Sequence, residues 1–146
     1  MVLADQAGKD VDINRVIKML LIHDLVEIDA GDAPIFGDYD AAALAAEEAA
    51  AATRIFGLLP PDQATAFRAL WDEFEAAETP DAQFAKSLDR FQPPNQNLAS
   101  GGGSWNDFGV DYPTIESRVG RKIAIGAPAL WDWIAPKIRA FLSRHT

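Results

Sequence analysis

Residues 19–32 read Met-Leu-Leu-Ile-His-Asp-Leu-Val-Glu-Ile-Asp-Ala-Gly-Asp, and this stretch combines a buried helix signal with a dense set of polar groups. An apolar run ends at His23, and four carboxylates follow by residue 32, while no Lys or Arg occurs between residues 19 and 53. Burying a carboxylate costs free energy unless positive charge neutralises it. A divalent metal held by His23 and Asp24 is therefore the simplest partner from outside the chain. Imidazole nitrogen and carboxylate oxygen together suit Mn, Fe, Co, Ni or Zn.

A lone His-Asp pair is also typical of an ordinary helix end with solvated acids and a hydrogen-bonded histidine. Three features favour a site. The pair follows a run too apolar for a surface face, Glu27 lies one helical turn after His23, and the Gly31-Asp32 turn brings back another carboxylate. The acids from Asp29 to Asp40 lie in a turn-rich segment, where Asp38 and Asp40 are interpreted as solvated.

The helix that delivers His23 is predicted to be central to the core. Asp10 or Asp12 can cap its N-terminus. Its apolar positions recur at helical spacing and leave few sides polar; they are Ile13, Val16, Ile17, Met19, Leu20, Leu21 and Ile22.

Composition limits the possible classes of protein. The 146 residues are 49% hydrophobic and 24% charged, which is typical of one globular domain with a sizeable core. A net charge of −9 disfavours a nucleic-acid partner. Because no apolar run approaches the length of about 18 residues that a membrane span needs, we expect no membrane partner. The absence of cysteine excludes disulfides and thiolate metal sites, and it is compatible with the cytoplasmic location that we expect.

The rest of the chain is predicted to be helical, because no alternating β pattern appears and Gly or Pro recurs at the breaks. Helices are expected over residues 41–56, from Pro61, over 81–92, over 113–125 and over 130–142. Pro93-Pro94 is predicted to end the helix over residues 81–92. Residues 100–105 are interpreted as a flexible connector with Trp105 anchored on the body. The sequence therefore predicts an all-α bundle.

Three acidic residues outside the first stretch have alternative interpretations. Asp89 lies beside the inward face of the 81–92 helix, so it is either a site residue or an exposed acid paired with Lys86 or Arg90. Glu47 and Glu48 are typical of surface acids.

The His23-Asp24 pair, followed by Glu27 and Gly31-Asp32, resembles the second motif of the HD-domain metal-dependent phosphohydrolases, and in particular their 5'-deoxynucleotidase branch. The resemblance covers at least residues 13–92, including residues 58–60, 70–75 and 84–90. Similar Gly-Gly-Gly-Ser-Trp loops occur in some relatives. The resemblance implies a single all-α HD-type domain over residues 1–146, a divalent metal ion (Mn, Co, Mg, Fe, Ni or Zn), a small phosphorylated substrate and a homodimer.

The same resemblance implies a metal site of a His, the His-Asp pair and a distant Asp. His23 and Asp24 match the pair and Asp89 matches the distant Asp, whereas the first His has no match. The remaining histidine, His145, is penultimate and is interpreted as a frayed terminal residue rather than a replacement ligand. Residues 1–7 resemble the last turns of the helix that bears the first His in relatives, so we expect the N-terminal segment to be lacking.

The resemblance and the chemistry of the residues together suggest roles. Glu27 is the candidate general base or water-orienting group, and Asp32 either assists it or protonates the leaving oxygen. Lys86 resembles a family lysine near the phosphate, and its alternative role is a salt bridge to Asp89 or another carboxylate of the site. The resemblance also implies that a Glu on the 41–56 helix can approach the metal site, which is the alternative interpretation of Glu47 and Glu48.

The function that we expect is metal-dependent phosphomonoester hydrolysis, with a (deoxy)nucleoside 5'-monophosphate as the leading substrate. Two alternatives remain open. One is a catalytically silent HD-fold fragment or dimerising module, and the other is an HD hydrolase of a different phosphate ester.

Overall fold

A computed structural model describes residues 2–144, and all regular secondary structure in this range is helical, with no β-strand. The predicted all-α class is therefore confirmed, while His145 lies outside the described residues. The elements are η1 (Ala4–Gln6), α1 (Ile13–Ile22), η2 (His23–Val26), α2 (Glu27–Ala30), α3 (Ala41–Phe56), α4 (Pro61–Ala76), α5 (Pro80–Ala99), α6 (Ser104–Phe108), α7 (Tyr112–Ile115), η3 (Glu116–Gly120), α8 (Arg121–Gly126) and α9 (Pro128–Leu142). None of the helices in the described range combines the length and apolar character of a membrane span.

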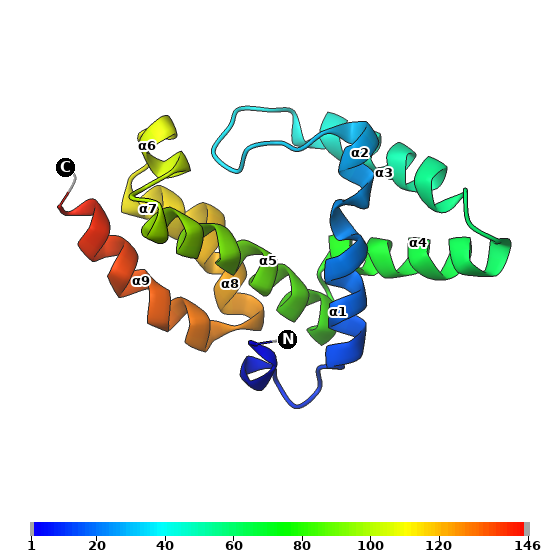
Figure 1. The fold of residues 1–146 in the computed structure, drawn as a ribbon, viewed down its shortest axis with the longest axis horizontal. Helices are drawn as coiled ribbons and strands as arrows, with labels where there is room; N and C mark the ends of the chain where they lie inside the picture. The colour runs from blue at the N-terminus through cyan, green and yellow to red at the C-terminus, as the bar shows by residue number, and fades with distance from the viewer. Residues whose placement is uncertain (1, 145–146) are drawn as a thin grey trace.

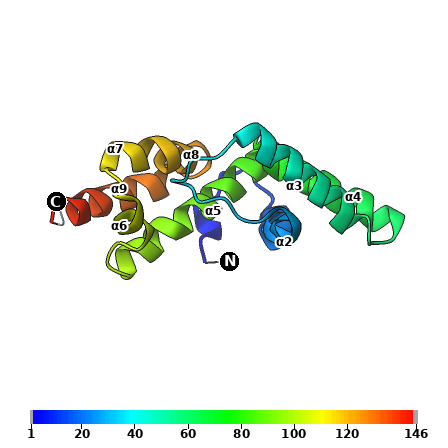
Figure 2. The same ribbon diagram turned by 90° about the horizontal axis from the view of Figure 1, so that it is seen from above.

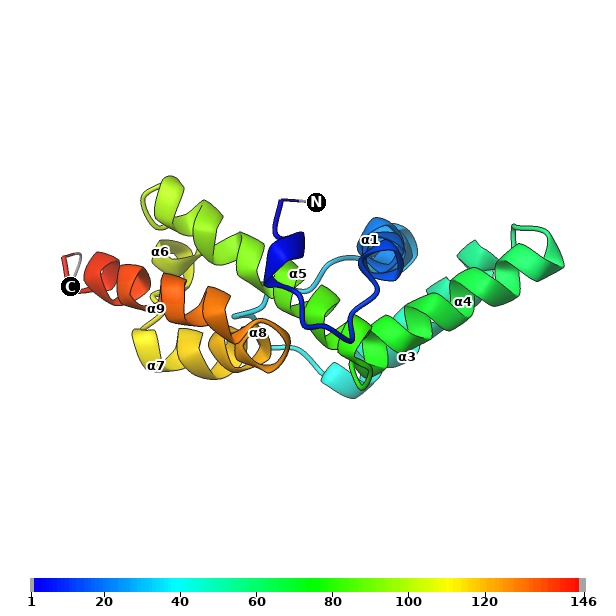
Figure 3. The same cartoon turned by 90° about the horizontal axis from the view of Figure 1, so that it is seen from below.

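Helix α5 is the axis of the molecule, and it contacts α1, α4, α8 and α9 (Figure 1). On one side of it, α3 and α4 pack as an extended pair next to α1. On the other side lie α7, α8 and α9 (Figure 2). The view from below shows α5 running between these two groups (Figure 3). One hydrophobic core continues through both groups, with Met19, Phe74, Phe84 and Ile134 almost completely buried.

Helix α1 is buried on the face that the sequence predicts. Asp12 caps it, because its carboxylate accepts hydrogen bonds from the backbone N–H groups of Asn14 at 2.9 Å and Arg15 at 3.3 Å. Val16 and Met19 are fully buried. The chain then tightens into the 3-10 turn η2, which begins at His23. The imidazole of His23 faces Asp89 of α5.

Helix α5 continues through Pro93 and Pro94, so the predicted end of this helix at Gln92 is wrong. Each proline lacks an N–H group, which leaves a carbonyl one turn earlier without its usual partner at a cost of about 3 kcal/mol. Phe91, Pro94 and Asn97 are nevertheless buried on one side of the helix. Tertiary packing of this second half of α5 outweighs the local break.

Two connecting segments make contacts beyond those predicted from the sequence. Asp40 is exposed, as predicted, and its carboxylate also caps α3 by accepting hydrogen bonds from Ala42 N–H at 2.9 Å and Ala43 N–H at 3.1 Å. The connector after α5 forms a turn in which Gly102 N–H donates to the Asn97 carbonyl at 2.7 Å. Trp105 follows in α6, and its 2% exposure confirms that it is anchored on the body.

Candidate active site

His23 has one ring nitrogen with a clear hydrogen bond and one facing two carboxylates. Nδ1 lies 3.0 Å from the Leu20 carbonyl, which can only accept, so Nδ1 carries a proton and donates it. Nε2 lies 2.9 Å from Oδ1 of Asp24 and 3.5 Å from Oδ1 of Asp89. Nε2 is buried, and neither contact has hydrogen-bond geometry. The structure thus brings together three side chains that the sequence proposed from two distant segments.

The charges around His23 favour a cation at Nε2. Burial lowers the pKa of His23, but the carboxylates of Asp89 and Asp24 outweigh it and raise this pKa overall. Burial raises the pKa of Asp89, whereas His23, Arg90 and Lys86 lower it, and the net direction is downward. Either a proton on Nε2 or a metal ion in the place of that proton would offset the negative charge of the two carboxylates.

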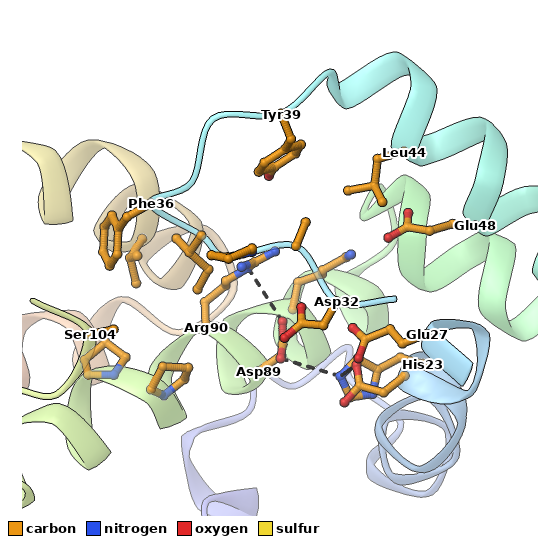
Figure 4. Close-up of a pocket in the computed structure, with 18 of the residues that line it drawn as sticks. His23, Glu27, Asp32, Phe36, Tyr39, Leu44, Glu48, Asp89, Arg90 and Ser104 are labelled. Atoms are coloured by element: carbon orange, nitrogen blue, oxygen red, sulfur yellow. Dashed lines mark ion pairs between the residues drawn. The ribbon is translucent and has the colours of Figure 1, made fainter. Parts of the chain in front are cut away.

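A cavity of about 380 Å³ opens beside this cluster, a size that suits a small molecule (Figure 4). Glu27 and Asp32 lie on its wall near His23, and Asp89 lies next to Arg90 further along. All six candidate residues from the sequence line this cavity: His23, Asp24, Glu27, Asp32, Lys86 and Asp89.

Glu27 has an unusual acid strength for a glutamate. Its partial burial raises its pKa to about 7, and the neighbouring negative charges of Asp24 and Asp32 act in the same direction. A carboxyl group with a pKa near neutrality can exchange protons in either direction at physiological pH, as general acid–base chemistry requires.

Lys86 and Arg90 of α5 bring positive charge to the cavity, although residues 19–53 contain no Lys or Arg. Arg54 of α3 forms an ion pair with Asp29, and neither residue of this pair lines the cavity. Lys86 lines the cavity, but its Nζ is 2.8 Å from Oε1 of Glu75 and 4.2 Å from the centre of the Phe74 ring. Of its two alternative roles, the salt bridge to a neighbouring carboxylate is present.

Arg90 is a cavity residue that the sequence analysis treated only as a partner for Asp89. Its Nε lies 3.6 Å from Oδ2 of Asp89, and this buried nitrogen has no hydrogen-bond partner in the described part of the chain. Arg90 follows Asp89 directly on α5 and points into the same cavity. Arg90 is the residue after Asp89, so the sequence places Arg90 near the cavity only once Asp89 is known to face inward.

The two acids on α3 have different surroundings. Glu48 lines the cavity, and burial together with the charge of Glu75 raises its pKa. Glu47 is exposed and does not line the cavity. The interpretation as a surface acid therefore holds for Glu47, whereas Glu48 faces the site.

The separations within the donor set are close to those between the ligands of a divalent ion. Two ligands at about 2.1 Å from the ion lie roughly 3.4 Å apart in a tetrahedral site and about 3.0 Å apart at right angles in an octahedral site. His23 Nε2 lies 3.5 Å from Asp89 Oδ1 and 2.9 Å from Asp24 Oδ1. No group of three or more His, Cys, Asp or Glu side chains within residues 2–144 is already arranged to hold an ion. The Asp24 side chain is 64% exposed and free to rotate, so the chemistry of the three residues fits such an ion.

Comparisons with known proteins give consistent matches. The family model described as HD domain matches residues 1–131. A protein named 5'-deoxynucleotidase HDDC2 from Xenopus laevis is 30% identical over 108 residues, which cover 74% of this chain and 48% of the relative. Its counterpart from Danio rerio is 31% identical over 86 residues, covering 58% of this chain and 43% of the relative. The chain thus spans less than half the length of these curated relatives.

A solved structure has the same fold. The crystal structure of a protein described as a predicted metal-dependent phosphohydrolase, from Magnetospirillum magnetotacticum MS-1, aligns with a TM-score of 0.91 and 42% sequence identity. The alignment covers 99% of this chain and 73% of that chain.

Proposed function

The chain belongs to the HD-domain family, and from this premise we propose that it is a metal-dependent hydrolase of small phosphomonoesters. The observation that carries the proposal is the convergence of His23, Asp24 and Asp89 at the wall of a cavity of about 380 Å³. The names of the two HDDC2 relatives favour a (deoxy)nucleoside 5'-monophosphate as the substrate. We also treat residues 1–146 as one HD-type domain.

His23, Asp24 and Asp89 are the proposed protein ligands of a divalent ion, which can be Mn, Co, Mg, Fe, Ni or Zn. When bound, such an ion lowers the pKa of a coordinated water and neutralises phosphate oxygens. The Leu20 carbonyl oxygen accepts a hydrogen bond from Nδ1–H of His23 and so fixes the orientation of the ring. Nε2 is then the nitrogen available to the ion.

Glu27 and Asp32 are the proposed proton-handling groups. In its ionised form, Glu27 accepts a proton from the attacking water while the oxygen of that water forms a bond to phosphorus. The bond from phosphorus to the ester oxygen breaks, and Asp32 in its protonated form gives its proton to the departing oxygen. The support for this role is that Asp32 lines the same cavity as Glu27. Asp32 assisting Glu27 is the alternative role.

Lys86 and Arg90 are the proposed positive groups for the phosphate. Lys86 is already paired with Glu75, so it contributes as a fixed positive charge. Arg90 has a buried Nε without a hydrogen-bond partner within residues 2–144, so it retains donor capacity toward an anion in the cavity.

Two family-based expectations complete the proposal, a homodimer and a cytoplasmic location. Exposed apolar side chains at Leu21, Ile28 and Trp133 are compatible with an interface between two copies. Sedimentation analysis of the purified protein tests the dimer, and fractionation of cells that produce it tests the location.

Phosphate release from nucleoside monophosphates in the presence of Mn, Co or Mg tests the proposed function. We expect Glu27→Gln to lower kcat about 100-fold, as is typical for the loss of an acid–base group. Glu47→Gln is the matched control because Glu47 is exposed outside the cavity, and its kcat should not change.

The outcome also separates the alternatives. Release from other phosphate esters but not from nucleotides favours the HD hydrolase of another ester. A properly folded protein that releases phosphate from no ester with any of these ions favours the silent HD-fold module.

A further inference from the structure

The cavity has a second end that the proposed chemistry does not use. Phe36 and Ser104 lie on one side of Arg90, whereas Glu27 and His23 lie on the other (Figure 4). A phosphoryl group at the carboxylate end would therefore leave the rest of its ester directed past Arg90 toward Phe36 and Ser104.

Two aromatic rings form the wall of this second end. Phe36 of the loop between α2 and α3 and Phe108 of α6 have ring centres 6.5 Å apart at 49°. Phe108 remains 48% exposed although it lines the cavity, so burial in the core does not account for its position. The loop that carries Phe36 is held by Arg118, whose Nη1 donates to the Ile35 carbonyl at 3.1 Å. The rings are thus placed by different elements around a common space.

Polar groups that can form further hydrogen bonds lie beside these rings. Asn97 is 7% exposed and donates from Nδ2 to Oγ of Ser104 at 3.0 Å. Within residues 2–144, Oδ1 of Asn97 accepts no hydrogen bond and the Ser104 hydroxyl donates none. Gly103 has φ of 45°, and a Cβ there would come within 2.5 Å of Asn97 Oδ1, so this glycine allows the close approach. Asn97 and Ser104 both line the cavity, so an amide and a hydroxyl group lie next to the aromatic wall.

We propose that Phe36, Phe108, Asn97 and Ser104 form a subsite for a planar, hydrogen-bonding ring on the leaving group of the substrate. This inference rests on the proposed phosphomonoester hydrolysis and adds to it the residues that select the leaving group. A heterocycle such as a nucleobase offers both a face for the aromatic side chains and an edge with donors and acceptors.

A pair of esters that differ only in the ring tests the subsite. We compare hydrolysis of a deoxynucleoside 5'-monophosphate with that of deoxyribose 5-phosphate, using the wild type and Phe108→Leu with added Mn. Loss of ring stacking should raise KM for the nucleotide roughly 10-fold and leave kcat within about twofold. KM for deoxyribose 5-phosphate should not change.

Trp133→Leu is the matched control. Trp133 is 52% exposed and pairs with Phe91 at 6.1 Å, much as Phe108 pairs with Phe36, but it does not line the cavity. This variant should leave KM unchanged for both esters. Equal kcat/KM of the wild type for the two esters, or an equal effect of Phe108→Leu on both, would overturn the subsite.

Calorimetric binding of the phosphate-free deoxynucleoside separates failure of the subsite from failure of the hydrolase. A wild type that releases no phosphate from either ester contradicts the proposed hydrolysis. If that protein still binds the nucleoside, and Phe108→Leu weakens binding roughly 10-fold, the subsite is supported independently. If the nucleoside binds wild type and Phe108→Leu equally, or binds neither, the subsite is overturned.

Discussion

At the scale of single residues, His23 connects the fold to the chemistry. Its Nδ1 is held by the carbonyl of Leu20 in the preceding helical turn, and its Nε2 faces Asp24 and Asp89. A cation between the two carboxylates and this buried nitrogen, either a proton or a metal ion, stabilises the arrangement. Proton and metal therefore compete for the same position, and metal affinity should rise with pH.

Glu27 gives a prediction for stability in the metal-free protein. Its pKa rises from 4.5 to about 7 on folding, so ionising it costs more in the folded than in the unfolded state. Stability is therefore lost as pH rises from about 4.5 to 7, and Glu27→Gln removes this loss. At about 1.4 kcal/mol per pKa unit, the upper limit of this loss is roughly 3.5 kcal/mol. Solvent around this partly exposed group reduces it to about 1 kcal/mol.

Urea unfolding with a chelator at pH 5 and pH 8 measures this effect. The free energy of unfolding of Glu27→Gln should exceed that of the wild type by about 1 kcal/mol at pH 8 and differ little at pH 5. Glu47→Gln serves as control. An equal difference at both pH values would show that the environment of Glu27 does not penalise its charge.

At the scale of elements, the contact between α5 and α8 holds Asp89 in place. Ser87 is fully buried on α5, donates to the Gln83 carbonyl at 2.7 Å and accepts from Gly126 N–H at 3.1 Å. A Cβ at Gly126 would come within 2.3 Å of the Gln83 carbonyl oxygen. The close approach of the two helices therefore requires glycine at this position.

Gly126→Ala should lower the free energy of unfolding by about 1–3 kcal/mol, because the added methyl group forces the two helices apart. Gly8→Ala is the control, since a Cβ there meets only Val11 at an ordinary 3.9 Å. Urea unfolding at pH 7 compares the two variants. A Gly126→Ala protein as stable as the wild type would contradict the close packing.

The sequence predicts some of these elements better than others. The limits of α3 and the start of α4 at Pro61 follow from local signals, namely an alanine-rich run and a proline at the first helical position. The continuation of α5 past Pro93 depends on burial of Phe91 and Pro94, which no local pattern contains. The sequence therefore gave the wrong end for the helix that carries Asp89.

The residues of the candidate site also divide into those that a local sequence pattern predicts and those that depend on how the helices pack. Local spacing pointed to His23, Asp24 and Glu27 because they lie within two helical turns of one another. Asp89 was included through the family resemblance, and its distance from His23 is a property of the packed helices. Arg90 and the second end of the cavity were missed, because their role depends on which elements meet around the cavity.

At the scale of the whole molecule, the candidate site joins parts of the chain that are far apart in sequence. The segment after α1 supplies His23 and Asp24. Helix α5 supplies Asp89, which faces His23 (Figure 4). The loop between α2 and α3 and the helix α6 close the other end of the cavity. An ion bound at His23 would therefore link α5 to the N-terminal helices, and it would stabilise the fold as any ligand of the native state does.

The metal content of the purified protein tests this account most directly. After incubation with Mn and removal of free ions, mass spectrometry should find about one ion per chain in the wild type. Asp24→Asn and Asp89→Asn should each lose it, whereas Asp38→Asn, an exposed acid outside the cavity, should retain it. Retention of the ion in both Asp24→Asn and Asp89→Asn, or no binding by the folded wild type, would contradict a metal centre at His23.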